Sequence, residues 1–206
     1  MPYENDVFLS YTHDHPFGEW VRDPFLPLFE GLLRASLGRA AVIFSDRDIP
    51  MGNSWPERLR HALATSRIMV GIWSPNYFIS SWCVCECSFM LHRERTLGFR
   101  TATKPEGLIV PVTLHDGARF PTYAKSIQYA DWTKYARVGD GFKKTERFVE
   151  FQDQIIEWAE DVALAINGAP DWDADWLTDD WLNAAVPGWN TLAPTPSIGF
   201  AAPKLS

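Results

Sequence analysis

Apolar residues gather along the chain in short runs that alternate with longer segments of helical spacing. Four runs have the length of a strand, namely 7–11, 40–44, 68–73 and 108–114. Three of these four runs are rich in Val and Ile. In the two segments between the first three runs, apolar side chains recur every three or four residues, at Phe25, Leu28, Phe29, Leu32 and Leu33 and then at Leu59, Ala62 and Leu63. Near-continuous apolar strands joined by helices predict a parallel sheet that is covered on both faces.

The second half of the chain completes this layout. We expect a weaker strand near 126–131 and a long amphipathic helix from about 142 to 167. The sequence therefore predicts an α/β, flavodoxin-like three-layer fold with a five-stranded parallel sheet, plus a C-terminal tail. Because Gly168 and Pro170 are typical of a helix end and the composition then changes, we expect a domain over 1–167 and a tail over 168–206.

The tail combines acidic and aromatic residues before it becomes rich in proline. Five Asp residues between 171 and 180 are interspersed with Trp172, Trp176 and Trp181, and the Pro-rich end follows Pro187. So much apolar surface predicts docking, either on the chain's own domain or on a partner such as a separate sensor protein. The Pro-rich end is expected to be extended, and either disordered or bound to a partner.

Composition limits the classes of function. The chain has 206 residues, 46% of them hydrophobic, which suits one compact domain with a full core. A net charge of −7 and the absence of a Lys/Arg-rich run argue against binding to nucleic acid or anionic lipid. No run approaches the roughly 20 apolar residues of a membrane span, and residues 1–6 do not resemble a signal peptide, so we expect a cytoplasmic protein.

Three cysteines lie close together, at Cys83, Cys85 and Cys87. They are too close and odd in number for a disulfide framework, and reduced thiols suit the cytosol. On a helix Cys85 would point away from the other two, and no fourth ligand is near, so we expect no metal site. His13 and His15 lie in a predicted loop, where histidines usually have no catalytic role, and we leave them outside the site.

Candidate chemistry lies after the strands, because ligands of a doubly wound sheet bind beyond the carboxyl ends of its strands. Residues 10–15 can offer hydroxyl and backbone N–H groups. Residues 44–55 are dense in charge, Pro and Gly and suit a lid or an interaction loop. Residues 74–86 pass into a helix whose start is indicated by Ser80 or Ser81.

Together these three segments resemble the Toll/interleukin-1 receptor (TIR) domain family, and in particular its bacterial immune-type NADases. The resemblance rests on Asp-Val-Phe-Leu-Ser-Tyr at 6–11, the loop 46–55 with its Gly52, and Ser-Pro-Asn-Tyr at 74–77, followed by Ser-Trp-Cys at 81–83 and by Glu86. It covers about residues 3–167 and is strongest over 68–86. It implies either signalling by TIR–TIR contact or cleavage of NAD to nicotinamide and ADP-ribose or a cyclic product, as in bacterial anti-phage defence or cell suicide.

The resemblance implies Glu86 as the catalytic carboxylate, with NAD as substrate and no resident cofactor. Trp82, four residues before Glu86, would lie on the same helix face. The resemblance also implies Tyr11, Thr12, Asp46 and Trp55 as further substrate-binding residues. The chemistry of the reaction agrees with one carboxylate. Breaking the bond between nicotinamide and ribose builds positive charge on the ribose, which an anion stabilises. Nicotinamide leaves as a neutral molecule, so no general acid is needed. Glu86 could instead be an acidic residue stabilised by the helix dipole, and Trp82 a core anchor.

Two rival functions remain at this stage. A non-catalytic TIR adaptor would use the same fold for TIR–TIR contacts alone, and a nucleoside deoxyribosyltransferase-like enzyme would also set a carboxylate against a glycosidic bond. For an enzyme, the resemblance implies activity in assembled TIR domains, with 46–55 at a self-association surface. The sequence does not position the nucleophile that would make the product linear, cyclic or transferred.

Overall fold

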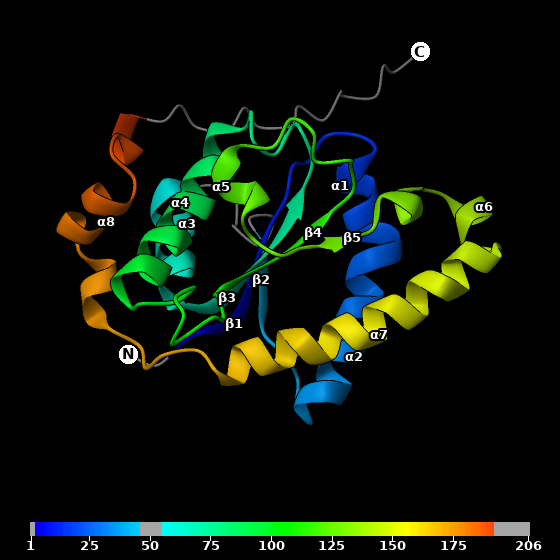
Figure 1. Ribbon diagram of the computed structural model, residues 1–206, viewed down its shortest axis with the longest axis horizontal. Helices are drawn as coiled ribbons and strands as arrows, with labels where there is room; N and C mark the ends of the chain where they lie inside the picture. Colours follow the sequence, from blue (N-terminus) through cyan, green and yellow to red (C-terminus); the bar gives the residue numbers. More distant parts are fainter. Residues whose placement is uncertain (1–2, 46–54, 192–206) are drawn as a thin grey trace, which may run out of the picture.

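The computed structural model describes residues 3–45 and 55–191, and its centre is a parallel sheet (Figure 1). The strands are β1 (Asn5–Ser10), β2 (Ile43–Ser45), β3 (Ser66–Trp73), β4 (Ile109–Thr113) and β5 (Ala130–Asp131). All four neighbouring pairs are parallel, in the order β2-β1-β3-β4-β5. This is the flavodoxin-like order, so the predicted fold class is confirmed.

The two edge strands differ from their predictions. Strand β2 begins at Ile43, not near Ala40, and β5 is reduced to Ala130 and Asp131. Val42 is 49% exposed, and its N–H donates to the Asp6 carboxylate (Oδ2) at 3.0 Å. An apolar run therefore predicts the approximate position of an edge strand. Hydrogen bonding to the neighbouring strand, β1 or β4, sets the first residue of the edge strand.

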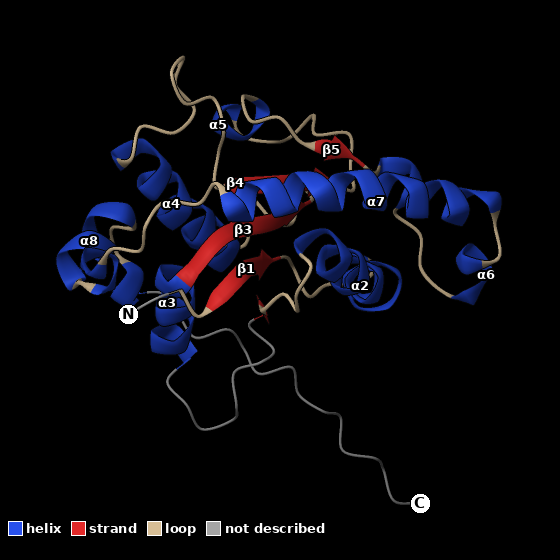
Figure 2. Ribbon diagram, turned by 90° about the horizontal axis from the view of Figure 1, so that it is seen from below, coloured by secondary structure: helices blue, strands red, loops and turns tan. Residues whose placement is uncertain are grey.

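Helices cover both faces of the sheet (Figures 1 and 2). One face carries α1 (Phe17–Trp20), the π-helical turn η1 (Val21–Phe25), α2 (Leu26–Leu37) and α7 (Glu146–Asn167). The opposite face carries α3 (Trp55–Thr65) and α4 (Ser81–Thr96). The short elements α5 (Thr122–Lys125), η3 (Thr133–Tyr135) and α6 (Asp140–Lys143) lie in the connections between β4 and α7.

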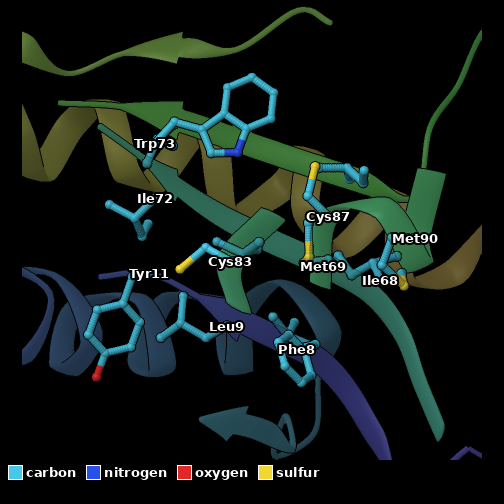
Figure 3. Packing of buried hydrophobic residues seen from close by; sticks show 14 of the residues in the cluster. Phe8, Leu9, Tyr11, Ile68, Met69, Ile72, Trp73, Cys83, Cys87 and Met90 are labelled. Atoms are coloured by element: carbon cyan, nitrogen blue, oxygen red, sulfur yellow. The ribbon is translucent and has the colours of Figure 1, made fainter. Parts of the chain in front are cut away.

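Aromatic and sulfur-containing side chains fill the two layers of the core. Under α2 and α7, the rings of Phe29 and Trp158 lie 5.1 Å apart and those of Trp132 and Trp158 5.0 Å apart. Large aromatic side chains of this kind dominate core burial. Under α4, Figure 3 shows Cys83, Cys87 and Met90 among the side chains of β1 and β3, which include Leu9, Ile68 and Ile72.

The helix predicted from about 142 to 167 is two helices. Thr145 is extended (φ −102°, ψ 154°) and separates α6 from α7, and its hydroxyl donates to the carbonyl of Phe142 at 2.7 Å. The break lets the Phe142 ring pack edge-on against Phe148 at 5.4 Å. Apolar spacing continues across the break, because both sides bury aromatic rings in the same core.

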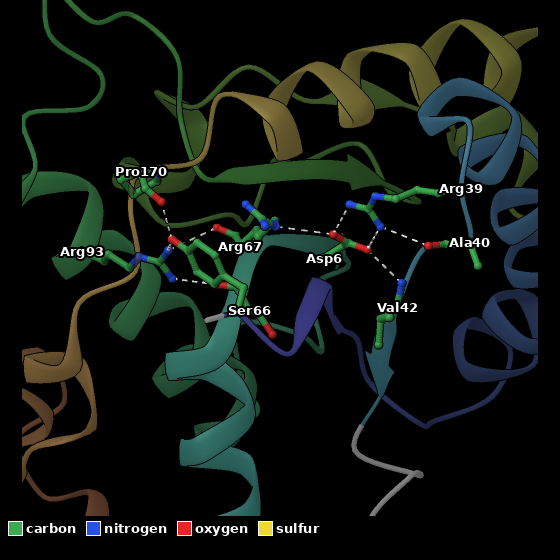
Figure 4. Close-up of polar contacts among 9 residues, drawn as sticks. Asp6, Arg39, Ala40, Val42, Ser66, Arg67, Arg93 and Pro170 are labelled. Atoms are coloured by element: carbon green, nitrogen blue, oxygen red, sulfur yellow. Dashed lines mark hydrogen bonds and ion pairs between the residues drawn. The ribbon is translucent and has the colours of Figure 1, made fainter. Parts of the chain in front are cut away.

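Buried charges at the amino ends of the strands are paired (Figure 4). At the start of β1, Asp6 accepts two hydrogen bonds from Arg39, at 2.7 and 2.6 Å, and one from the N–H of Val42. Burial alone would raise the pKa of Asp6, but the hydrogen bonds from Arg39 and Val42 outweigh it and lower that pKa. These contacts fix the amino end of the sheet.

Residues 170–191 pack on the outer side of α3 and α4 (Figures 1 and 2). They form η4 (Ala174–Leu177), α8 (Asp179–Ala185) and η5 (Trp189–Thr191). Trp176, Leu182 and Trp189 are each 1% exposed. The division into a domain over 1–167 and a tail over 168–206 stays a prediction, although α7 does end at Asn167.

Within the described ranges 3–45 and 55–191, no helix is both long and apolar enough to span a bilayer.

Candidate functional site

A cavity of about 360 Å³ opens at the carboxyl ends of β1 and β3. The segment after β1, the segment after β3 and the first turns of α4 supply its walls. Its lining residues are Tyr11, Thr12, His13, Asp14, Asn76, Ile79, Ser80, Trp82, Cys83 and Glu86. The cavity therefore lies where ligands of a doubly wound sheet bind.

The start of α4 places two of the predicted residues in this cavity. Ser80 is extended (φ −68°, ψ 114°), and its hydroxyl accepts a hydrogen bond from the N–H of Cys83 at 3.4 Å, so Ser80 rather than Ser81 caps the helix. Trp82 and Glu86, four residues apart, then both face the cavity and are 9% and 5% exposed. Trp82 is thus both a cavity wall and part of the core.

Glu86 lies in the second turn of α4, beyond the first turn where a helix dipole stabilises an acid most. The Ser10 hydroxyl donates to its Oε2 across 2.5 Å. Ser10 Oγ also lies 2.8 Å from the hydroxyl of Tyr77. Because the Ser10 proton is used on the carboxylate, the Tyr77 hydroxyl is the donor of that second bond.

Tyr77 and Ser10 form a buried support for Glu86. They are 0% and 1% exposed, and burial, followed by the nearby Cys87, Cys83 and Glu86, raises the pKa of Tyr77 well above its ordinary value. The Tyr77 hydroxyl therefore stays protonated at neutral pH and can donate a hydrogen bond to Ser10. Neither residue is among the predicted site residues, although Ser10 lies within the motif at 6–11 and Tyr77 ends the motif at 74–77.

Polar groups line the cavity across from α4. Asn76 donates its amide to Asp14 Oδ2 at 2.5 Å. Thr12 Oγ1 and Asp14 Oδ1 are buried, and neither has a hydrogen-bond partner among residues 3–45 and 55–191. A hydroxyl-bearing ligand or a water molecule could satisfy them, since buried polar atoms normally have partners.

The loop after β1 is held close to α1. The N–H of Gly18 donates to the carbonyl of Asp14 at 2.8 Å, and a Cβ at position 18 would lie 2.5 Å from the carbonyl oxygen of His13. Only glycine permits this approach. The loop conformation places His13 on the cavity wall, with its ring 5.0 Å from that of Tyr11, although the sequence pattern alone places it outside the site.

The other predicted residues divide into two groups. Tyr11 and Thr12 line the cavity with Trp82 and Glu86. Asp46 lies outside the described residues, and Trp55 begins α3 but its side chain is not described. The roles of these two residues therefore stay predictions. His15 is exposed and pairs with Glu19 at 3.1 Å.

The cysteines on α4 are reduced and weakly acidic. Burial, with Glu86 nearby, raises the pKa of Cys85 to about 11, and burial, with Glu94 and Glu86 nearby, raises that of Cys87 to about 12. Such thiols stay protonated at neutral pH and make poor nucleophiles and poor metal ligands. In the part of the chain that the structure describes, no three His, Cys, Asp or Glu side chains are grouped to hold a metal ion.

A larger cavity, of about 920 Å³, lies on the other side of the molecule, between the amino end of β4 and the end of α7. Its most prominent cation, Arg100, already donates to Glu94 at 2.7 Å and to the carbonyl of Ile109 at 2.8 Å. It contains neither Glu86 nor Trp82. We therefore take the smaller cavity as the candidate site.

Comparison with known proteins identifies the family. The family model described as "TIR domain" matches residues 7–145, which is most of the chain and includes every residue that lines the cavity. The chain therefore belongs to the TIR domain family.

Two plant proteins are among its relatives. Over 81 residues the chain is 40% identical to Protein SUPPRESSOR OF npr1-1, CONSTITUTIVE 1 of Arabidopsis thaliana, and over 80 residues it is 35% identical to Disease resistance protein RPS6 of the same plant. Each alignment covers 39% of this chain but only 5% and 6%, respectively, of those proteins. The chain thus spans a small part of the length of these relatives.

Solved TIR domains are also similar. The TIR domain of the Toll-related receptor TRR-2 from Hydra magnipapillata is 20% identical, with a TM-score of 0.44, over 73% of this chain and 98% of that one. The TIR domains of the activated Roq1 resistosome, which directly recognises the pathogen effector XopQ, are 23% identical, with a TM-score of 0.40, over 80% and 84%.

Proposed function

We propose that this TIR domain cleaves NAD at the bond between nicotinamide and ribose, releasing nicotinamide and either ADP-ribose, by hydrolysis, or a cyclic ADP-ribose, by cyclisation. The observation that carries the proposal is the pairing of a buried carboxylate, Glu86, with an aromatic wall, Trp82, in one cavity. NAD is the substrate, and the reaction needs no resident cofactor.

The chemistry needs only one carboxylate. As the bond from the ribose carbon C1′ to the pyridinium nitrogen breaks, its electron pair moves to the nitrogen and nicotinamide leaves as a neutral molecule. The ribosyl group becomes cationic, and the Glu86 carboxylate stabilises it. Water then adds to C1′ and loses a proton to give ADP-ribose, or a nitrogen of the adenine adds to give the cyclic product.

The other lining groups suit the same substrate. The indole of Trp82 offers a surface to the pyridinium ring, and such aromatic faces attract cations. Thr12 and Asp14 offer hydrogen-bonding atoms to ribose hydroxyls. Ser10 and Tyr77 hold Glu86 in place from behind.

The cavity has room for part of the substrate. At about 360 Å³ it is near the lower end of small-molecule sites, enough for the nicotinamide ribose moiety but not for a whole dinucleotide. The adenosine end would then lie outside the cavity, against residues 46–55 or a second copy of the domain. We therefore propose that activity depends on TIR–TIR self-association.

The setting follows from the same proposal. A cytoplasmic protein would have access to NAD, and uncontrolled cleavage would deplete it, which suits a defence that kills an infected bacterial cell. A separate sensor protein would then trigger assembly. No part of the proposal involves nucleic acid or a membrane.

The alternative function is a non-catalytic adaptor that acts through TIR–TIR contacts alone. One observation favours it: α7 exposes three apolar side chains, Val149, Ile156 and Leu164, which are 58%, 44% and 69% exposed. Apolar groups of this kind on one helix are typical of a contact surface. The adaptor and the enzyme differ in whether Glu86 is needed for chemistry.

The test is release of nicotinamide from NAD by purified protein, at rising protein concentration and with a crowding agent. We expect cleavage in the assembled state, and a loss of about a thousandfold in Glu86→Gln, because the amide cannot stabilise the cation. Self-association measured in parallel should be the same in both proteins. Wild-type protein that assembles but releases no nicotinamide would establish the adaptor instead.

A further inference from the structure

The segment that follows α7 is anchored on α3 and α4 at several independent points. Arg60 of α3 pairs with Asp179 at 2.6 Å, and the indole N–H of Trp172 donates to the carbonyl of Ala64 at 3.1 Å. The guanidinium of Arg93, on α4, lies 3.7 Å from the centre of the Trp176 ring. These contacts hold residues 172–179 near the carboxyl end of α4, far along the helix from the cavity at its amino end.

Arg93 explains why an aromatic residue docks there. Its side chain is 0% exposed, and it donates to the carbonyl of Ser66 at 2.8 Å and to the hydroxyl of Tyr3 (Figure 4). Burial lowers the pKa of Arg93 to about 10, so it stays charged at neutral pH. The face of Trp176 supplies favourable electrostatics to this buried cation.

The last described part of the segment runs back along α4 towards the cavity. Trp181 lies edge-on to His92, at 4.7 Å between ring centroids, and Trp189 lies edge-on to Trp82, at 5.3 Å and 89°. Gly188, at φ +86°, makes the turn between Val186 and Trp189, a backbone conformation that favours glycine. Trp189 is 1% exposed, so it is buried against the wall that lines the cavity.

We infer that Trp189 is a positioning residue for the candidate site. Trp189 fixes the indole of Trp82 so that this indole can receive the nicotinamide ring. The inference rests on the proposed function and deepens it: part of the substrate wall is set by a segment that follows the last helix of the sheet layers. Trp189 does not line the cavity and acts only through Trp82.

Packing of Trp189 limits the rotational freedom of the Trp82 ring. Trp82 lies in the first turn of α4, with the cavity on one side, so its packing on the other side restricts its rotamer. An edge-to-face aromatic pair adds specific attraction to the burial of area. Without Trp189, substrate binding would have to order the indole first, which weakens affinity without changing the carboxylate that drives the chemistry.

The experiment compares steady-state kinetics of NAD cleavage in full-length proteins. We expect Trp189→Ala to raise KM about five- to tenfold while kcat changes by less than about twofold, the size expected for loss of one aromatic pair. Trp189→Phe should restore KM to within about twofold of wild type, because a ring edge is retained. Trp181→Ala is the matched control: it removes an indole from the same segment, away from the cavity, and should leave KM unchanged.

A second variant guards against simple misfolding. Gly188→Ala strains the turn and displaces Trp189 without removing an aromatic ring, and it should raise KM in the same direction. Amide hydrogen exchange at Val84 to Cys87 should be faster in Trp189→Ala and Gly188→Ala than in Trp181→Ala, because the start of α4 has lost its support.

The outcomes separate the inference from the function on which it rests. Wild-type protein that cleaves NAD, with the same KM in Trp189→Ala, overturns the role of Trp189 and leaves the proposed function intact. An equal rise of KM in Trp181→Ala overturns it too, because the effect would then be general to the segment. A wild type that never cleaves NAD overturns both.

Discussion

Helix α4 carries two buried glutamates, eight residues apart, whose surroundings are opposite. Glu94 is 2% exposed, and four donors surround its carboxylate: two nitrogens of Arg100 and the N–H groups of Leu108 and Ile109. Glu86 is 5% exposed, accepts a hydrogen bond from Ser10 and lines a cavity. Burial of a carboxylate does not by itself distinguish a structural acid from a chemical one; its neighbours do.

The same contrast holds for the two ends of the sheet. At the amino ends, Asp6 is bound by Arg39, Glu94 by Arg100, and Arg93 by backbone carbonyls and Tyr3. At the carboxyl ends, hydroxyl groups, aromatic rings and the carboxylates of Asp14 and Glu86 line the candidate site. The buried charges named at the amino ends are bound by opposite charges or hydrogen-bond partners, while at the carboxyl ends Glu86 faces the candidate site.

The sharpest test of the contrast is Glu94→Gln. We expect the free energy of unfolding to fall by about 3 kcal/mol, because Arg100 is left without its anion in a partly buried site. Chemical denaturation with urea measures this. Glu86→Gln is the matched control and should change the free energy of unfolding by less than about 1 kcal/mol, since the amide can still accept the Ser10 hydrogen bond.

If the two variants were equally destabilised, Glu86 would be a structural acid like Glu94, and the contrast would fail. At temperatures where Glu94→Gln is folded, its NAD cleavage per molecule should remain within about threefold of wild type, because Arg100 and Glu94 do not line the candidate site.

Asp6→Asn tests the amino end through pH. We expect a loss of about 2 kcal/mol at pH 7, from the hydrogen bonds of Arg39 and Val42 to a charged acceptor. The folded-state pKa of Asp6 lies below its ordinary value of 3.8, so its ionised form stabilises the folded protein at higher pH. That stabilisation is complete above pH 3.8 and is lost as the pH falls through the lower, folded-state pKa.

The difference in unfolding free energy between wild type and Asp6→Asn should therefore be constant between about pH 5 and 8 and shrink below about pH 4. Denaturant titrations across this range measure it. A difference that does not narrow in acid would mean that the asparagine perturbs packing and not the ion pair.

Ser10→Ala gives the smallest expected effect, at the carboxyl end. Loss of the hydroxyl should lower kcat for NAD cleavage about tenfold, because Glu86 loses the donor that orients it, with KM within about twofold. Ser10→Thr keeps the hydroxyl and should recover part of kcat. Unchanged kcat in Ser10→Ala would show that Glu86 needs no support from β1.

Particular residues show how much of the fold and of the candidate site the sequence predicts. Val and Ile runs located the central strands, because strands buried on both faces have no polar positions. They placed β2 and β5 less well, since an edge strand pairs with one neighbour only, and that pairing covers three residues of β2 and two of β5. Helical spacing put Trp82 and Glu86 on one face, and the segments 10–15 and 74–86, which follow two strands, contain every lining residue of the cavity.

Other features depended on contacts between distant parts of the chain. The link from Tyr77 through Ser10 to Glu86 joins two loops and a helix, and no local pattern predicts it. His13 was judged as a loop residue, yet the close approach of α1 at Gly18 places it on the cavity wall. The contact between Trp82 and Trp189 joins residues more than a hundred positions apart in the sequence.

By itself, then, the sequence determined the layers of this protein, the order of its elements and the helix face that carries Glu86, because periodicity and caps are local properties of the backbone. The tertiary structure alone decided that Arg100 binds Glu94 while Glu86 lines a cavity, and that Trp189 packs against Trp82. Ion pairing, burial and aromatic packing depend on distances between segments, and those distances are fixed only when the whole chain has folded.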